Sequence, residues 1–174
     1  MIQKLIGGGD LPPKATLNQL LKGFVGGTVG ILILCLLAEQ SQVPWLMAPF
    51  GATCVLLFAV PTSPLAQPRN IIAGHFISAA VGLAALYGFG DSYLVMSLAV
   101  GSAIFLMQYF RAVHPPAGAN PIVIALAGTA HADWTFLFTP VLIGSIALVG
   151  IGALLNNSDS QQKWPLYWFG SSKS

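Results

Sequence analysis

The stretch Ala112-Val113-His114-Pro115-Pro116-Ala117-Gly118-Ala119-Asn120-Pro121 decides how this chain folds. It separates two strongly apolar runs, and a helix that enters it cannot continue through it. Pro115 and Pro116 have no backbone N–H, and each disfavours the α conformation in the residue before it. A new helix can begin here, because proline is tolerated in a first turn. Such a start presents unpaired N–H groups and the positive end of the helix dipole. Inside a membrane it would be a candidate anion site.

The composition indicates a membrane protein. Of the 174 residues, 55% are hydrophobic and 7% are charged, and the mean hydropathy is +0.76. Soluble domains carry about 25% charged residues. We therefore expect a single transmembrane domain over residues 1–174, surrounded by the lipid bilayer. The net charge of +2 is too small to suggest a nucleic-acid partner. Cys35 and Cys54 lie in apolar runs and are interpreted as packing residues, so we expect no metal and no cofactor.

Six apolar segments follow one another along the chain. A helix needs about 20 residues to cross a hydrocarbon core of roughly 30 Å. The first, third and sixth segments reach this length, and the fourth nearly does. The second and fifth are short, and if their regular helix starts at Phe50 and Ala117 each covers about half of the bilayer. The segments are 18–38, 46–60, 69–89, 92–110, 116–130 and 134–155.

The charged residues favour six crossings over four. With six crossings, all Lys and Arg residues fall on one side of the membrane, and Glu39, Asp91 and Asp133 fall on the other. If the two short segments instead dip in and return, Arg69 and Arg111 move to the second side and the separation is lost. Cytoplasmic loops carry an excess of Lys and Arg. We therefore expect six crossings, with short cytoplasmic tails at 1–17 and 156–174.

The chain also repeats itself. Pro49-Phe50-Gly51-Ala52-Thr53 matches Pro116-Ala117-Gly118-Ala119-Asn120, and 81–86 resembles 149–154 at nearly the same offset. Three crossings in each half would make the halves inverted relative to each other. We therefore expect an all-α membrane protein of two inverted three-helix repeats, about 18–89 and 92–155, whose short segments two and five are broken at Pro-x-Gly-Ala. Interrupted segments at matching places in two halves point to a transporter site.

The polar residues near the two breaks suit an anion. No Asp or Glu lies deep in an apolar segment, whereas Arg69, Asn70, His75, Arg111 and His114 lie close to the breaks. The N–H groups at 51–53 and 118–120 would add donors without a full charge. Each side chain also has a simpler reading. His114 could cap segment five or act as a gate, His75 could be a core histidine, and the arginines could be topology anchors that contact lipid phosphate. Of the two arginines, Arg111 is the better candidate for function.

Three ordered motifs resemble the HPP family of integral membrane proteins. They are His114-Pro115-Pro116-Ala117-Gly118-Ala119, then 48–52, then 63–70 followed by Gly74-His75, and the similarity spans about 44–155. The family has members in cyanobacteria and chloroplasts that transport nitrite. The resemblance implies that activity here, in a multi-pass protein of the bacterial plasma (inner) membrane. Asn120-Pro121 departs from the Thr or Ser and the aliphatic residue expected after the alanine.

We therefore expect a transporter or channel for a small inorganic anion, nitrite above others, and no catalytic residues. A membrane-embedded sensor or scaffold, or an enzyme without transport activity, stays open as an alternative, as does a homo-oligomer. A cation channel is disfavoured by the Arg and His residues at the breaks. Arg69, Asn70, His75 and Arg111 are expected to tune or gate the site. The expected anion-binding residues are Pro49, Phe50, Gly51, Ala52, Thr53, His114, Pro115, Pro116, Ala117, Gly118, Ala119 and Asn120.

Overall fold

The computed structural model describes residues 9–41, 43–158 and 163–169, and the regular elements in these ranges are all helical. The expectation of an all-α membrane protein is confirmed. Three described helices are long and apolar enough to cross a membrane, namely 17–41, 68–89 and 134–156. These are the first, third and sixth predicted segments. The elements are α2 (Leu17–Ser41), α3 (Ala48–Ala59), η1 (Pro64–Ala66), α4 (Pro68–Phe89), α5 (Tyr93–Tyr109), η2 (Pro115–Ala119), α6 (Asn120–Ala127), α7 (Trp134–Phe136), η3 (Leu137–Ile143) and α8 (Gly144–Asn156).

The two predicted breaks are short helices that start inside the molecule. Helix α3 begins at Ala48 with Pro49 in its first turn, and η2 begins at Pro115 with Pro116 next. In both places proline is at the position where its missing N–H costs nothing. Twelve residues of α3 are about 18 Å long, so α3 covers little more than half of a bilayer core.

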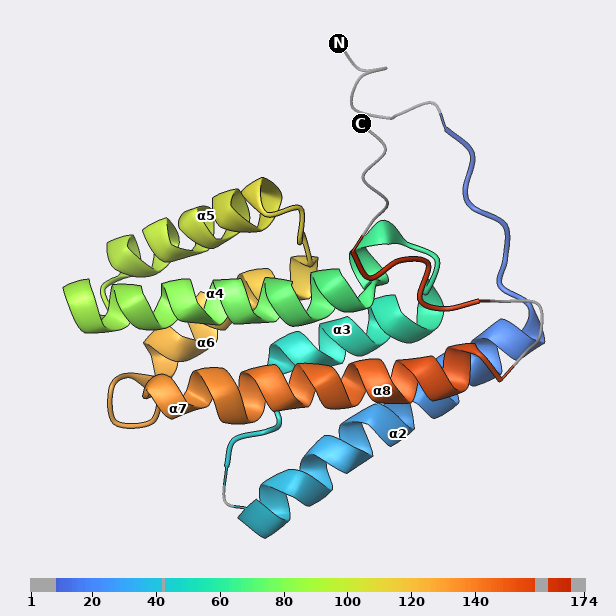
Figure 1. Cartoon of the computed structure of the whole chain (residues 1–174), viewed down its shortest axis with the longest axis horizontal. Coiled ribbons are helices and arrows are strands. Elements are labelled where there is room, and N and C mark those ends of the chain that lie inside the picture. The colour runs from blue at the N-terminus through green and yellow to red at the C-terminus, as the bar shows by residue number, and fades with distance from the viewer. Residues whose placement is uncertain (1–8, 42, 159–162, 170–174) are drawn as a thin grey trace.

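The two short helices point in opposite directions from a common centre. Figure 1 shows α3 running from the middle of the molecule to one end, and α6 running from the middle to the other. Helix α3 contacts η2, the short helix that leads into α6. Helix α3 ends next to the start of α4, at the end where α2 begins (Figure 1), so the chain passes through rather than turning back. This is the path expected for six crossings, a number that stays a prediction, and the opposed directions are those expected of an inverted repeat.

The charged residues separate along the same axis. Arg69 lies at the start of α4 and Lys163 follows α8, both at the end where α3 finishes, whereas Asp91 and Asp133 occupy the connections at the other end (Figure 1). Lys4 and Lys173, which the sequence places with the basic residues, lie outside the described part of the chain.

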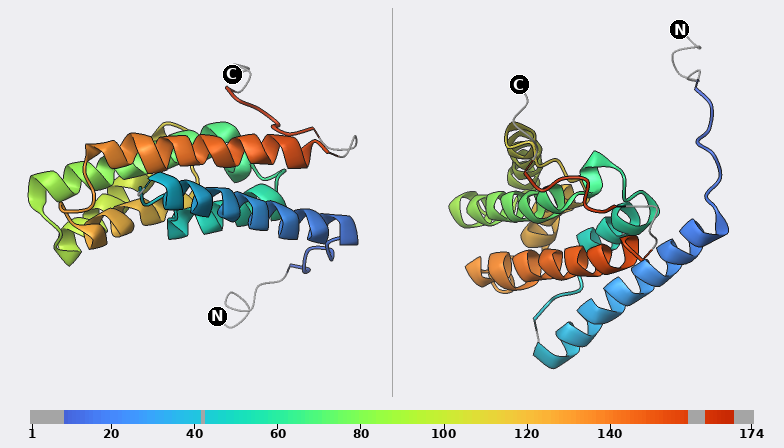
Figure 2. Two further views of the ribbon diagram at one scale, coloured as in Figure 1. Left: turned by 90° about the horizontal axis from the view of Figure 1, so that it is seen from below. Right: turned by 45° about the vertical axis from the view of Figure 1, so that its right-hand side comes forward.

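Helices α4 and α8 form the middle of the bundle, with α2 and α5 outside them (Figures 1 and 2). Ten residues of α4 are buried, compared with three each in α2 and α5. Glycines spaced along one face of α4 explain how it packs. A Cβ on Gly74 would lie 2.7 Å from His114 Cβ, and a Cβ on Gly82 would lie 2.9 Å from Pro121 Cα. Small residues let helices approach closely in membranes, and here they seat α4 against the second break.

Helix α8 has the same relation to the first break. A Cβ on Gly144 would lie 2.6 Å from the ring of Phe50, and one on Gly152 would lie 2.7 Å from Leu57. The third helix of each half therefore packs on the short helix of the other half. Ahead of α8, the wide turns of η3 accommodate Pro140, which cannot donate an N–H to a regular helix.

The segment after α8 folds back onto the bundle. The Leu166 N–H donates to Gln67 Oε1 at 2.8 Å, and the Tyr167 hydroxyl donates to the Pro64 carbonyl at 2.9 Å. Gln67 is buried and also donates to the Pro61 and Ser63 carbonyls. The part of the expected tail at 163–169 is thus a packed cover over the loop between α3 and α4.

Candidate functional site

A buried polar cluster occupies the place where the two short helices meet. It consists of Thr53 from α3, His75 from α4, His114 before η2 and Asn120 at the start of α6. All four side chains are at most 1% exposed. Polar side chains at this depth of a membrane protein are costly and mark functional sites by default. The repeat predicted that both breaks contribute to one site. It did not predict that His75 of α4 joins them.

Thr53 is the centre of the cluster. Its Oγ1 lies 2.8 Å from His75 Nε2, 2.9 Å from His114 Nε2 and 3.0 Å from the Pro49 carbonyl oxygen. The two imidazole rings have centroids 5.0 Å apart, and the ring of Phe50 packs edge-on to His75 at 5.0 Å. One hydroxyl therefore connects two histidines that are 39 residues apart in sequence.

The outer partners of the cluster are backbone and amide groups. His114 Nδ1 lies 2.8 Å from the Leu65 carbonyl oxygen, so it donates to the loop between α3 and α4. The Asn120 amide nitrogen donates to the His75 carbonyl at 3.0 Å and lies 3.2 Å from His75 Nδ1. Asn120, where the resemblance led us to expect Thr or Ser, is a direct member of the cluster.

Other polar groups hold the second break in place. Asn70 Nδ2 donates to the Val113 carbonyl at 2.9 Å, and Ser78 Oγ donates to the Ala117 carbonyl at 2.6 Å. Arg69 Nη2 donates to the Phe110 carbonyl at 2.9 Å. Arg111 is exposed in the turn after α5, with φ at 53°, and the structure does not bring it to the cluster. Of the two arginines, it is Arg69 that binds the connection leading to the break.

The backbone donors expected at the breaks are used within the helices. Since α3 begins at Ala48, the N–H groups of 51–53 lie in its interior, where each pairs with a carbonyl four residues earlier. At the second break the Ala117 N–H donates to the His114 carbonyl at 3.0 Å and the Asn120 N–H donates to the Ala117 carbonyl. The structure thus does not support these N–H groups as free anion donors, because each helix starts several residues before them.

The faces of the breaks that point away from the cluster form an open hollow of about 560 Å³. Ala119 is half-buried and Pro115 is exposed in its wall, and Gly51 and Gly118, also half-buried, each precede a lining residue in the chain. Non-helical backbone at membrane depth is tolerated where it is covered by protein or lines a cavity. The residues that line the hollow are Ala48, Pro49, Ala52, Val55, Leu56, Pro115, Pro116 and Ala119.

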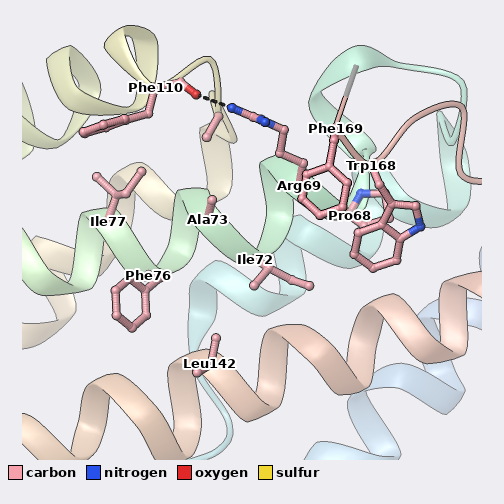
Figure 3. Close-up of a pocket in the computed structure, with 11 residues that line it drawn as sticks. Pro68, Arg69, Ile72, Ala73, Phe76, Ile77, Phe110, Leu142, Trp168 and Phe169 are labelled. Carbon is pink, nitrogen blue, oxygen red and sulfur yellow. Dashed lines mark hydrogen bonds between the residues drawn. The ribbon is translucent and has the colours of Figure 1, made fainter. Parts of the chain in front are cut away.

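A second hollow of about 570 Å³ lies on the side of α4 shown in Figure 3. Arg69 is the one charged residue in its wall, and its guanidinium points to the Phe110 carbonyl. Ile72, Phe76 and Leu142 make the wall apolar, and Trp168 lies across one end (Figure 3). We assign the candidate site to the cluster instead, because the cluster gathers buried polar groups from both halves.

Sequence reasoning named all four cluster residues but missed several that support them. Ser78, Gln67 and the Leu65 carbonyl act through hydrogen bonds to segments distant in sequence. Ser78 had a signal, because it lies between Gly74 and Gly82 on one face of α4. Among the described residues, no group of three or more His, Cys, Asp or Glu side chains is placed to hold a metal ion.

This arrangement defines a helical membrane protein with a buried polar centre between two opposed short helices. The model of the transmembrane region of HPP proteins matches residues 12–165, and the chain belongs to this family. A transmembrane protein of Dictyostelium discoideum is 35% identical over 169 residues, covering 91% of this chain and 59% of the relative. A second from the same organism is 33% identical over 178 residues, covering 96% and 57%. The chain thus spans less than two thirds of either relative's length, and no solved structure matches it significantly.

Proposed function

We propose that this protein transports a small inorganic anion across the membrane, with nitrite as the substrate, and that it is not an enzyme. One observation carries the proposal. Two opposed short helices meet at a buried cluster that contains hydroxyl, imidazole and amide groups and no carboxylate among the described residues. Short helices that meet at mid-membrane are typical of transporter sites. A cluster without carboxylates does not repel an anion.

The substrate path in this proposal runs between α3 and η2. The cluster is closed on this side by Pro49 and Pro116, which line the hollow, and on the other by α4. Because each half contributes one short helix, rocking of one half against the other would open the cluster to either end. In our proposal both termini are cytoplasmic and the protein lies in a bacterial inner membrane, in line with the separation of basic and acidic residues.

The test is nitrite uptake into proteoliposomes, compared with protein-free liposomes. Gly51→Leu and Gly118→Leu are the informative variants, since a Cβ at either position meets no atom within 4 Å, and size-exclusion chromatography checks that each variant is folded. A leucine at either break would obstruct the path, and we expect uptake to fall by roughly tenfold or more, equivalent to about 1.4 kcal/mol. Gly101→Leu on α5 is the matched control, because that position is also open but lies far from both breaks in the sequence.

Normal uptake by both break variants would contradict the path. With the wild-type protein, competition by nitrate, formate, chloride and bicarbonate would define the selectivity among small anions. If wild-type protein gives no anion flux at all, the protein is a sensor or scaffold and the proposed function fails.

A further inference from the structure

The hydrogen atoms of the cluster can be assigned from its geometry. A carbonyl oxygen accepts only, so His114 Nδ1, 2.8 Å from the Leu65 oxygen, carries a hydrogen. When His114 is neutral, its Nε2 is bare and must accept from the Thr53 hydroxyl at 2.9 Å. Thr53 Oγ1 then accepts from His75 Nε2–H at 2.8 Å. His75 Nδ1 is left bare and accepts from the Asn120 amide nitrogen, which at 3.2 Å is nearer to it than the amide oxygen at 3.4 Å.

This assignment gives one directed chain of hydrogen bonds. It runs from Asn120 through His75, Thr53 and His114 to the Leu65 carbonyl, and every nitrogen in it has a partner. The other tautomer of His75 would leave two bare Nε2 atoms competing for one hydroxyl hydrogen. Because an unpaired buried polar atom costs about 1–3 kcal/mol, the directed chain is the preferred neutral state.

The same heavy atoms also accommodate one additional proton. If His114 Nε2 gains a hydrogen, it donates to Thr53 Oγ1, which has two lone pairs and can accept from both histidines. The Thr53 hydroxyl hydrogen then rotates to the Pro49 carbonyl oxygen, 3.0 Å away. The cluster becomes a monocation in which all hydrogen bonds are kept. Protons can therefore enter and leave without a rearrangement of the fold.

The surroundings supply no fixed charge to balance this proton. Among the described residues, no Asp, Glu, Lys or Arg side chain hydrogen-bonds to the cluster. The elements packed against it carry Cys54 on α3, Arg69 and Tyr87 on α4, the exposed Tyr93 and Tyr109 on α5 and Arg111 beyond it. Arg69 is bonded to Phe110, and Arg111 and Tyr109 are exposed. An isolated charge in this environment is costly, whereas a proton and a monovalent anion together are neutral.

From these observations we propose that the His75–Thr53–His114 chain is the proton-coupling site of the transporter, taking up one proton with each anion. The inference rests on the proposed function. Since proton and anion each stabilise the other in a poorly solvated site, the coupling is reciprocal and the transport is an electroneutral symport.

The first experiment measures coupling in proteoliposomes that hold a trapped pH-sensitive dye, with the membrane potential clamped. Nitrite uptake should acidify the lumen by one proton per anion, accelerate with an inward proton gradient, and be unaffected by the potential. Protein-free liposomes correct for nitrous acid that crosses the lipid. Thr53→Val should abolish the acceleration by the gradient, and Thr53→Ser, which keeps the hydroxyl, should restore it.

Uptake that responds to the potential and not to the proton gradient would overturn the coupling while leaving anion transport intact. Absence of uptake under every gradient would instead refute the proposed function. The proton site can then be tested without transport. The chain has three histidines, so His131→Ala leaves only His75 and His114.

In His131→Ala protein, ¹⁵N NMR of the imidazoles from about pH 8 to about pH 4 counts the protons bound. We expect the two rings to take up one shared proton as a coupled unit, and Thr53→Val to make them titrate independently. Two independent titrations in protein that retains Thr53, or no titration, would overturn the proton site.

Discussion

His114→Ala should reduce nitrite uptake by at least about tenfold, an effect as large as that of a leucine at either break. The substitution removes the bond to Thr53 at 2.9 Å and the bond to the Leu65 carbonyl at 2.8 Å. Thr53 is buried and keeps His75 and Pro49 as partners, whereas the part-buried Leu65 carbonyl loses this donor. Leaving a buried polar group unpaired costs about 1–3 kcal/mol, where about 1.4 kcal/mol corresponds to a factor of ten. Uptake should be measured per correctly folded protein, separated by size-exclusion chromatography.

Two further substitutions separate the two contacts of His114. Asparagine places an amide nitrogen near the position of Nδ1, so His114→Asn should keep the hydrogen bond to Leu65 and lose the hydrogen bond to Thr53. The side-chain amide of glutamine reaches the position of Nε2, so His114→Gln should keep the hydrogen bond to Thr53. We expect His114→Gln to retain more uptake, because Thr53 connects to the second histidine.

The control for this series is His131→Ala. His131 is exposed near the start of α7, with Asp133 close by in the chain, and its substitution should leave uptake unchanged. Equal uptake by His114→Ala and His131→Ala would show that the cluster is a structural feature and not part of the transport path.

Gly74→Ala should produce the largest loss of stability. Its Cβ would lie 2.7 Å from His114 Cβ and 2.9 Å from the Ala112 carbonyl oxygen, which is backbone and cannot move aside alone. Overpacking of this kind costs typically about 1–3 kcal/mol. We expect a lower apparent melting temperature in detergent. Uptake should also fall, because α4 would push the connection before η2 away from Thr53.

Gly88→Ala, on the same helix, is the matched control. A Cβ there meets no atom within 4 Å, and alanine is favoured over glycine in a helix by up to about 1 kcal/mol. Its melting temperature should equal or exceed that of the unsubstituted protein. If Gly74→Ala and Gly88→Ala melt together, the close approach between α4 and the second break is refuted.

Most of the architecture could be predicted from the sequence. Apolar length predicted the three long helices, and the prolines predicted where α3 and η2 begin, because proline restricts the local backbone whatever surrounds it. The repeat and the separation of charges predicted opposed halves and six passages. These are properties of local chemistry and of the membrane, so they can be read in sequence order.

The site was only partly predictable, because its contacts join segments that are far apart in the sequence. The sequence analysis named all four cluster residues, Thr53, His75, His114 and Asn120. It also suggested backbone N–H groups as the donors, and Arg111 as the arginine with the functional role. The structure assigns the hydrogen bonds to side chains instead and uses Arg69 to hold the connection. Which helix pairs with which break depends on Gly74, Ser78 and Gly82 of α4, whose role appears only when the second break lies against them.

By itself, the sequence determined that this chain is an all-helical membrane protein with two proline breaks, because composition and proline act locally. The tertiary structure alone decided that the two breaks share one threonine hydroxyl between two histidines. That contact joins α3, α4 and the residue before η2, and only the packing of three distant segments brings these atoms within 2.9 Å.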